Sequence, residues 1–379
     1  MRVFVGICTL AALLAVTAST SGEARSGPRA PSTTASAPLT FAAGCATGDR
    51  ATLAAVGDLL FHDAVQARAL APGRSFRALW APLLPVLEGA DLSYGNLEGP
   101  AARGVRIGGI AVDDPGRRLD GIVYGRSRGA LVFNYHPSVI GDLAASGFKV
   151  LSTANNHAAD RGPLGIDRTI DELAAHELAY SGTRRRGDAL SPWGTIVAAA
   201  GMKIGWLACT YSTNGMPDKL GQVLNCYANK AAILDEVRRM RAGGAADAVI
   251  VAPHWGHEGS HVPLKADRAW AREMIEAGAA AIVGTHPHVL QPWERVTASD
   301  GREGLVIYST GNFISNQRSL TQRTGIVALV ELVRGAGGAV VSAAGFIPTW
   351  VDIEGGHVVR EMPVDRADAL RSALRLLAA

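Results

Sequence analysis

Side chains that can bind a metal ion follow one short apolar run after another in this sequence. They are Asp58, Asn96, Glu98, Asn156, His254, His286 and His288. Carboxylate and amide oxygens and imidazole nitrogens are ligands of divalent metals in proteins. Sites that mix such ligands can polarise a phosphoryl or carbonyl oxygen and generate a hydroxide near neutral pH. The sequence therefore predicts a site for one or two divalent ions of the Mn, Zn or Fe type.

Each candidate ligand also has a purely structural interpretation when it is taken alone. Asp58 is in a position to cap a helix, and Asn96 with Glu98 is compatible with a capped turn before Pro100. A lone histidine after an apolar strand, such as His254, is more often a buried core residue than a ligand. The metal prediction rests on the combination of His254 with the histidines of the next strand end and with Asp58.

His157 and Asp160 are the candidate catalytic pair. His157 directly follows two asparagines, and its imidazole can protonate a leaving group. Asp160, three residues later, can hold that imidazole in one tautomer. The structural alternative is a histidine that only caps the helix after it.

Further polar residues are predicted to contact the substrate. His62 lies four residues after Asp58, and the two side chains face the same way if this segment is helical. The other predicted substrate-binding residues are Tyr211, Asn214, Glu258 and Asn312. For the Gly311–Asn312–Phe313 string, a turn that supports the site from below is an equal alternative.

The apolar runs that precede these residues predict short buried strands, because they are bounded by glycine and polar residues. These runs cover 52–56, 91–94, 148–154, 248–253, 280–284 and 305–309. Helical spacing of apolar residues covers 137–146, 163–176, 231–241 and 266–277, and this alternation predicts an α/β fold. Ligands bind beyond the carboxyl ends of strands in open α/β sheets, so the six strand ends are expected to meet at one edge of one sheet. Two consecutive runs at 325–333 and 339–346 predict antiparallel pairing.

Composition and the N-terminal segment limit the classes of protein to which this chain can belong. With 48% hydrophobic and 19% charged residues the chain is globular, and a net charge of +3 argues against a nucleic-acid partner. The short basic run Arg184, Arg185 and Arg186 is interpreted as a solvated loop. Residues 1–18 are typical of a secretion signal, with an uncleaved membrane anchor as the alternative. The predicted organisation is a signal at 1–18, a Ser/Thr/Ala/Pro-rich linker at 19–50, one domain at 51–360 and a C-terminal helix at 361–379.

The chain has four cysteines, and export makes disulfides possible. Cys209 and Cys226 flank a short loop and are predicted to pair. Cys8 lies in the signal segment, which leaves Cys45 as an unpaired residue of the linker.

The ordered motifs resemble those of the CapA family of capsule (poly-γ-glutamate) biosynthesis proteins, whose domain is similar to calcineurin-like metallophosphoesterases. The strings that match, in family order, are Ala55–Val56–Gly57–Asp58, Gly95–Asn96–Leu97–Glu98, the run from Ala154 to Gly162, the run from Thr210 to Gly215, His254–Trp255–Gly256–His257–Glu258, the run from Gly284 to Gln291, and the run from Tyr308 to Phe313.

The resemblance implies a four-layer fold, with two β-sheets packed between helices. It also implies that Asp58, Asn156, His254, His286 and His288 are metal ligands and that His157 is the catalytic imidazole. The chain departs from the family pattern at three places. Asn96 and Glu98 stand where phosphoesterases carry a bridging aspartate, Gly259 replaces an aromatic residue, and Asn316 replaces an acidic one.

Three functional hypotheses follow. The first is an exported, metal-dependent hydrolase or transferase that acts on an anionic capsule polymer or its precursor. The second is a non-catalytic subunit that holds such a polymer in a capsule synthesis membrane complex. The third is a general metallophosphodiesterase. The expected location is the periplasm, the cell envelope or the extracellular space.

Overall fold

The computed structural model describes residues 39–126 and 131–363 of the chain. The predicted signal segment and most of the predicted linker and C-terminal helix lie outside these residues. A short 3-10 helix, η1 (Ala42–Cys45), precedes the first strand, and the side chain of Phe41 is buried in the core. The folded part therefore begins a few residues before the predicted boundary, because one aromatic side chain anchors the end of the linker.

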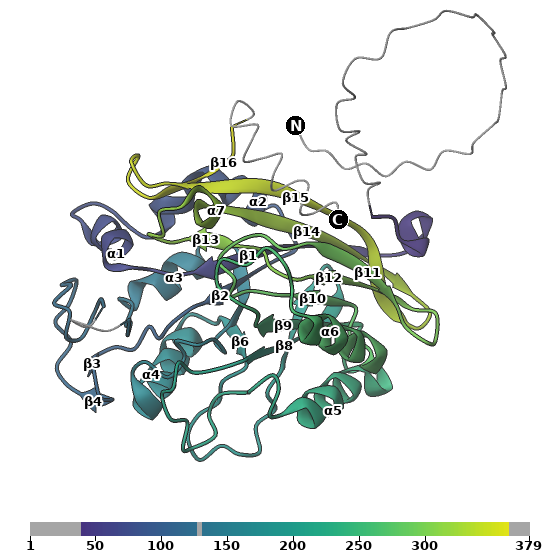
Figure 1. The fold of residues 1–379 in the computed structure, drawn as a ribbon, viewed down its shortest axis with the longest axis horizontal. Helices are drawn as coiled ribbons and strands as arrows, with labels where there is room; N and C mark the ends of the chain where they lie inside the picture. Colours follow the sequence, from purple (N-terminus) through teal and green to yellow (C-terminus); the bar gives the residue numbers. More distant parts are fainter. Residues whose placement is uncertain (1–38, 127–130, 364–379) are drawn as a thin grey trace, which may run out of the picture.

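Two β-sheets form the centre of the described structure (Figure 1). The first has eight strands among the described residues, in the order β16-β15-β14-β1-β2-β5-β6, with β13 pairing beside β1. Its strands are β1 (Arg50–Leu59), β2 (Leu92–Leu97), β5 (Phe148–Ser152), β6 (Ala179–Ser181), β13 (Asn312–Ile314), β14 (Thr324–Gly335), β15 (Gly338–Asp352) and β16 (Val358–Glu361). β1, β2, β5 and β6 are parallel, whereas β14 and β15 pair antiparallel, as predicted.

The second sheet has six strands among the described residues, in the order β11-β12-β10-β9-β8-β7. They are β7 (Thr195–Ala199), β8 (Met202–Thr210), β9 (Ala248–His254), β10 (Ala281–Val283), β11 (Trp293–Thr297) and β12 (Glu303–Ile307). A small hairpin, β3 (Val105–Arg106) with β4 (Ile110–Ala111), lies in the connection between β2 and β5.

The expectation that six strand ends meet at one edge of one sheet is wrong. β1, β2 and β5 belong to the first sheet, whereas β9, β10 and β12 belong to the second. Apolar runs identify buried strands but carry no information on which neighbour each strand pairs with. The candidate residues therefore converge from two facing sheets.

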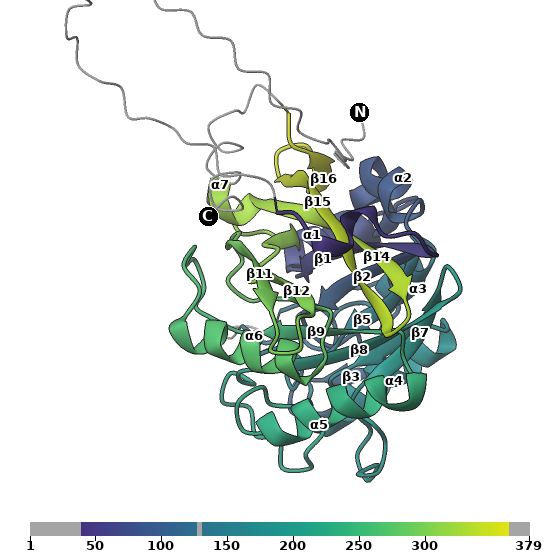
Figure 2. The ribbon, with the colours of Figure 1, turned by 90° about the vertical axis from the view of Figure 1, so that its right-hand side faces the viewer.

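Helices cover the outer faces of both sheets, which gives four layers. Against the first sheet lie α1 (Asp63–Leu70), η2 (Arg77–Leu83), α2 (Leu84–Leu87) and α3 (Ser138–Ala144). Against the second lie α5 (Lys230–Arg241) and α6 (Lys265–Ala277), which run side by side in Figures 1 and 2, with η3 (Ala242–Gly244) after α5. α4 (Gly162–Ala175) lies near β6 at the edge of the first sheet, and α7 (Leu320–Arg323) is a single turn before β14.

The sequence explains these helices. α6 buries Trp270, Ala271, Met274 and Ile275, which recur on one face at helical spacing, and it stops at Gly278, whose φ of 123° few other residues adopt. α4 carries Pro163 in its first turn, where the missing N–H costs no hydrogen bond.

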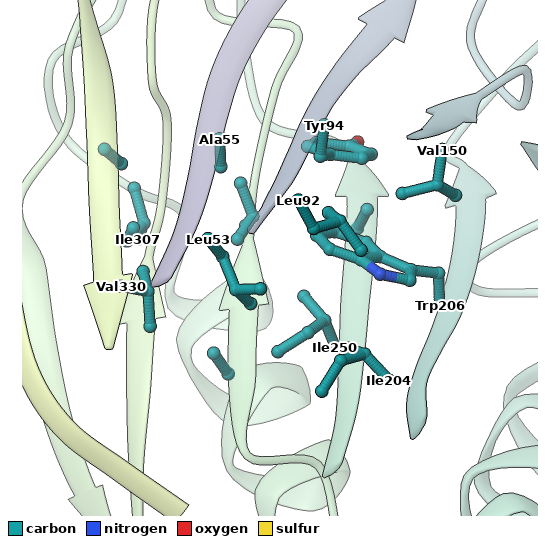
Figure 3. Close-up of a cluster of buried hydrophobic side chains, with 14 of the residues drawn as sticks. Leu53, Ala55, Leu92, Tyr94, Val150, Ile204, Trp206, Ile250, Ile307 and Val330 are labelled. Carbon is teal, nitrogen blue, oxygen red and sulfur yellow. The ribbon is translucent and has the colours of Figure 1, made fainter. Parts of the chain in front are cut away.

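The main core lies between the two sheets. Figure 3 shows Leu53, Leu92 and Val150 of the first sheet with Ile204, Trp206 and Ile250 of the second. The rings of Tyr94 and Trp206 stack across this interface with their centroids 4.5 Å apart. This apolar contact fixes one sheet against the other, and so fixes the distances between residues at their ends.

Disulfides and hydropathy complete the description. Cys209 and Cys226 form a disulfide, as predicted. Cys45 is also disulfide-bonded, so its interpretation as an unpaired residue is wrong. Cysteine spacing along the chain does not show which sulfur atoms come within bonding distance in the fold. In the part of the chain that the structure describes, no helix is long and apolar enough to cross a bilayer.

Candidate metal centre

Three buried side chains at the ends of two strands form the centre of the site. Glu98 follows β2 of the first sheet, and His286 and His288 follow β10 of the second. One ligand atom from each of the three lies within 4.8 Å of the others. The backbone at both histidines is left-handed, with φ of 98° at His286 and 57° at His288. Such strained conformations of non-glycine residues gather at functional sites.

Several polar atoms at this centre have no hydrogen-bond partner among the described residues. They are both carboxylate oxygens of Glu98 and Nδ1 of His286. Buried polar atoms in native proteins are almost always paired, since an unpaired one costs about 1–3 kcal/mol. Glu98 and His286 also offer ligand atoms within 4.8 Å of each other, and a bound cation would satisfy unpaired lone-pair donors of this kind.

The electrostatics of the centre favour a positive charge. Burial, and then repulsion by Asp58, raise the pKa of Glu98 well above its usual value. Burial lowers the pKa of His286 to about 3, with His288 adding to the effect. Burial also opposes a charge on His288, but the Glu98 and Asp58 carboxylates outweigh it and raise the pKa of His288 to about 10. The positive charge that a proton on His288 supplies here is one that a metal ion would also supply.

Asp58 lies at the end of β1, between two amide residues of neighbouring strands. It is in register with Asn96 of β2 on one side and with Asn312 of β13 on the other. The Asn96 amide donates to Asp58 Oδ1 at 2.8 Å, and Asp58 Oδ2 lies 3.1 Å from His288 Nδ1. The same His288 nitrogen is 3.0 Å from Asn312 Oδ1. Asn312 is thus buried beneath His288, where it supports the histidine.

His254 and Asn156 contact each other beside this centre. His254 Nε2 donates to Asn156 Oδ1 at 2.9 Å, and His254 Nδ1 accepts from the Thr285 hydroxyl at 2.9 Å. Burial, reinforced by His286 and His288, lowers the pKa of His254 well below its usual value, so the ring is neutral. Neutral imidazole is the form that binds a metal. Glu98 Oε1 lies 3.6 Å from His254 Nε2 and also 3.6 Å from His288 Nε2.

The structure reveals two supporting residues that were not predicted. Thr285 orients His254, and Asn155 donates to the Asn96 side-chain oxygen at 3.2 Å and to the Leu97 carbonyl at 2.6 Å. Both are direct neighbours of predicted ligands in the sequence. The only sequence feature that could have indicated these two supporting residues is that each directly precedes a predicted ligand. The residues that they contact are distant along the chain.

His157 and Asp160 form the predicted pair. Nδ1 of His157 lies 2.8 Å from Asp160 Oδ2, and the Phe133 backbone N–H donates to the same oxygen at 2.6 Å. The Phe133 ring packs against the imidazole, with centroids 4.6 Å apart. The carboxylate and the ring fix the orientation of His157, and its other nitrogen is left for a different partner.

Tyr211, Asn214 and Glu258 lie around the rim. The Tyr211 ring is 4.5 Å from that of His286, and the Asn156 amide donates to Asn214 Oδ1 at 3.3 Å. Glu258 is exposed, and after burial its charge is the next cause that raises the pKa of Tyr211. The Cys209–Cys226 disulfide closes the loop that carries Tyr211 and Asn214.

The helical turn expected between Asp58 and His62 is absent from this segment. β1 runs to Leu59, and His62 is the residue before α1, because the strand pairs with β13 past Asp58. His62 Nδ1 accepts from the Asn316 backbone N–H at 3.2 Å, and the Asn316 side chain contacts His357 at 2.8 Å. Burial, and then His288, lower the pKa of His62 to about 4.

Comparison with known proteins places this site in a family. The model of the family described as "Bacterial capsule synthesis protein PGA_cap" matches residues 52–317. The chain belongs to this capsule synthesis family. The match spans every predicted ligand and the His157–Asp160 pair.

Capsule synthesis relatives are found in two bacilli. The chain is 27% identical over 277 residues to the capsule biosynthesis protein CapA of Bacillus anthracis, which covers 71% of this chain and 61% of the relative. It is 34% identical over 179 residues to the PGA biosynthesis protein CapA of Bacillus subtilis (strain 168), which covers 45% of this chain and 43% of the relative. The chain thus spans about three fifths and two fifths of the lengths of these relatives.

Solved structures with a similar arrangement have low sequence identity. The calcineurin-like phosphoesterase YfkN from Bacillus subtilis covers 87% of this chain and 99% of its own, with 14% identity and a TM-score of 0.46. A hypothetical protein from Thermus thermophilus covers 78% and 98%, with 16% identity and a TM-score of 0.43.

Proposed function

We propose that this chain is an exported capsule biosynthesis protein that binds one or two divalent metal ions and acts as a hydrolase or transferase on an anionic polymer such as poly-γ-glutamate. Membership of the capsule synthesis family supports the biological role. The catalytic part of the proposal depends on the site.

The observation that carries the proposal is the set of unpaired, buried ligand atoms of Glu98 and His286, which lie beside His288. These three residues would hold an ion, with Asp58, Asn156 and His254 adjacent to it. Bound there, a divalent ion supplies a polarised substrate oxygen and an acidic water molecule.

The chain itself supplies the proton transfer. Asp160 holds Nδ1 of His157, so Nε2 is the nitrogen that can give a proton to a leaving group. Phe133 and Asp160 fix the imidazole before substrate arrives, which reduces the entropy lost in reaching the reactive geometry.

One observation favours a second candidate, a non-catalytic subunit that holds the polymer for a membrane-bound capsule complex. The Asn96 side chain is fully engaged, since its nitrogen donates to Asp58 and its oxygen accepts from Asn155. Glu98 is then the acidic ligand that this strand end offers, in place of the usual bridging aspartate. A centre with this ligand set can order an anionic chain without cleaving it. A general metallophosphodiesterase is the weaker alternative.

The test combines metal content with turnover. Protein purified from its native host is assayed by elemental analysis, and cleavage of poly-γ-glutamate and of phosphoesters is measured with and without chelator. The proposal expects bound transition metal and chelator-sensitive cleavage of the polymer. Fully metallated protein that cleaves neither substrate supports the holding subunit, and chelator-sensitive cleavage of phosphoesters alone supports the phosphodiesterase.

A further inference from the structure

A second cavity, separate from the metal centre, opens between the edges of the two sheets. It has a volume of about 250 Å³. It lies between β6, the edge strand of the first sheet, and the start of β7, the edge strand of the second. The loop that connects these strands covers it and carries the basic run that the sequence analysis interpreted as a solvated loop. The side chains that matter below are Tyr180, Arg184, Arg185, Asp188 and Trp193.

The lining of this cavity is rich in hydrogen-bond donors. The Tyr180 hydroxyl and the Trp193 indole N–H have no hydrogen bond to any described residue. Arg184 uses Nε and Nη1 on the carbonyls of Gly221 and Ala189, which leaves Nη2 without a partner among the described residues. Arg185 uses Nη1 on Asp171 at 2.8 Å, and this pair is partly exposed to solvent.

Among the described residues, Asp188 is the one acidic residue that lines the cavity, and each of its oxygens already accepts a hydrogen bond. Asp188 Oδ1 accepts from the Ser191 backbone N–H at 3.2 Å, and its Oδ2 accepts from the Ser191 hydroxyl at 2.5 Å. A ligand that enters here therefore meets unpaired donors and two arginines against a single lining carboxylate, so the lining carries a net positive charge. The complementary ligand brings acceptor oxygens and negative charge.

The aromatic groups give the cavity a fixed shape. The Arg184 guanidinium lies 4.0 Å from the centre of the Trp193 ring, and its two carbonyl bonds hold it in that place. Burial raises the pKa of Tyr180, so its hydroxyl is a donor across the physiological range. An arginine that is already positioned loses little entropy when it binds a carboxylate.

The cavity shares one lining residue with a small hollow nearer the metal centre. Thr183 lines it and also lines a narrow hollow bounded by Gly99, next to Glu98, and by Ala158, next to His157. The hydroxyls of Thr183 and Thr153 are 2.6 Å apart in that hollow.

We infer that this cavity is a second binding site for carboxylate groups, and that it holds a γ-linked glutamate unit of the polymer at a distance from the metal centre. The choice of polymer rests on the proposed function, whereas the carboxylate chemistry rests on the cavity alone. The cavity size suits one or two units rather than a folded partner.

The basic run offers a matched pair of variants for the test. Arg185 lines the cavity, whereas Arg186 pairs with Asp167 and does not line it. Each arginine contacts one aspartate of α4 and each is about half exposed, so the variants lose the same charge from the same loop. Binding of a short γ-linked glutamate oligomer to the full chain is measured by titration calorimetry for Arg185→Gln, Arg186→Gln and Tyr180→Phe.

Arg185→Gln is expected to weaken binding by roughly 10-fold, because a charged hydrogen bond is lost. Tyr180→Phe is expected to weaken it by about threefold, and Arg186→Gln by less than about twofold. An uncharged γ-linked glutamine oligomer is expected not to bind. Equal affinities for the two arginine variants, together with an unchanged Tyr180→Phe, overturn the inference, as does a wild-type protein that binds no oligomer.

The failure of this inference is distinguishable from that of the proposed function. Arg185→Gln is expected to retain wild-type metal content and kcat while KM rises. If the wild type contains metal and cleaves polymer but Arg185→Gln behaves as wild type, the proposed carboxylate site in the cavity is wrong, whereas the proposed enzymatic function is supported. If the wild type shows no cleavage, and Arg185→Gln loses oligomer binding, the proposed carboxylate site is supported, whereas the proposed enzymatic function is wrong.

Discussion

Replacing Glu98 with glutamine should raise the stability of the metal-free protein and reduce the stability that a bound metal adds. Both oxygens of Glu98 are buried and lack a hydrogen-bond partner, and burial together with repulsion by Asp58 outweighs the attraction of His288 for the carboxylate. Glutamine keeps the shape and removes the charge. We expect metal-free Glu98→Gln to be more stable than the metal-free wild type by about 1–3 kcal/mol, the usual cost of one unsatisfied buried group. In a domain of this size, that raises Tm by roughly 2–10 °C.

With metal the variant loses most or all of this advantage, because glutamine is a poor ligand. An ion at about 100 times its Kd stabilises the wild type by about 2.7 kcal/mol. If the lost ligand weakens affinity by about 100-fold, the same ion concentration stabilises the variant by only about 0.4 kcal/mol. The assay is thermal unfolding of both proteins in chelator and in added metal. Glu258→Gln, which changes an exposed rim carboxylate, is the control and should leave both values unchanged.

Two results would refute this reasoning. The first is a metal-free Glu98→Gln protein less stable than the metal-free wild type, since the carboxylate must then have a favourable partner. The second is an undiminished metal-induced rise in Tm, which would place Glu98 outside the ion's coordination.

Three other predictions concern residues around this centre. His157→Ala should retain wild-type metal content but lose turnover by about 10²–10⁴-fold, because its proton transfer is lost. A variant that keeps its turnover and loses only stability would show that His157 has a purely structural role, although not as a cap of α4, whose N-cap is Arg161. The pKa of His62 is lowered from 6.5 to about 4, so the unfolded state binds more protons between these values and stability falls as the pH drops through them. From pH 7 to pH 5 the expected loss is about 2 kcal/mol in chelator, and urea unfolding should show this extra loss in the wild type but not in His62→Gln. Reduction of Cys209–Cys226 should cost about 3 kcal/mol and weaken oligomer binding through the Tyr211 loop, and equal Tm values before and after reduction would contradict this.

The sequence identified the strands and helices that precede the candidate ligands, because burial leaves a local pattern, but it did not identify β7, β8 or α1. The runs before Asp58, His254 and His286 are strands, and the helical spacing before Gly278 ends at that residue. Pairing between sheets has no such local pattern. The sequence therefore placed all the strand ends at one sheet edge, whereas the structure places them at the facing edges of two.

For the candidate site, too, residue types could be predicted from the sequence, whereas contacts between distant segments could not. Residue types identified Glu98, His286 and His288, which the structure brings within ligand distance of one another. The helical turn proposed for His62 failed because the pairing of β1 with β13 continues past Asp58. The supporting roles of Thr285 and Asn155 depend on partners distant along the chain, and no periodicity reveals such contacts.

The left-handed backbone at His286 and His288 decides which variants make informative controls. Alanine at either position loses the imidazole but keeps the unfavourable φ, which costs an L-residue roughly 1–2 kcal/mol. Glycine loses the same imidazole and adopts this backbone freely. The variants His286→Ala and His286→Gly would therefore both lack the imidazole ligand. They would differ in the backbone strain at residue 286, which alanine retains and glycine relieves. Properties that fall equally in both belong to the imidazole, and properties that recover in the glycine protein belong to the shape of the chain.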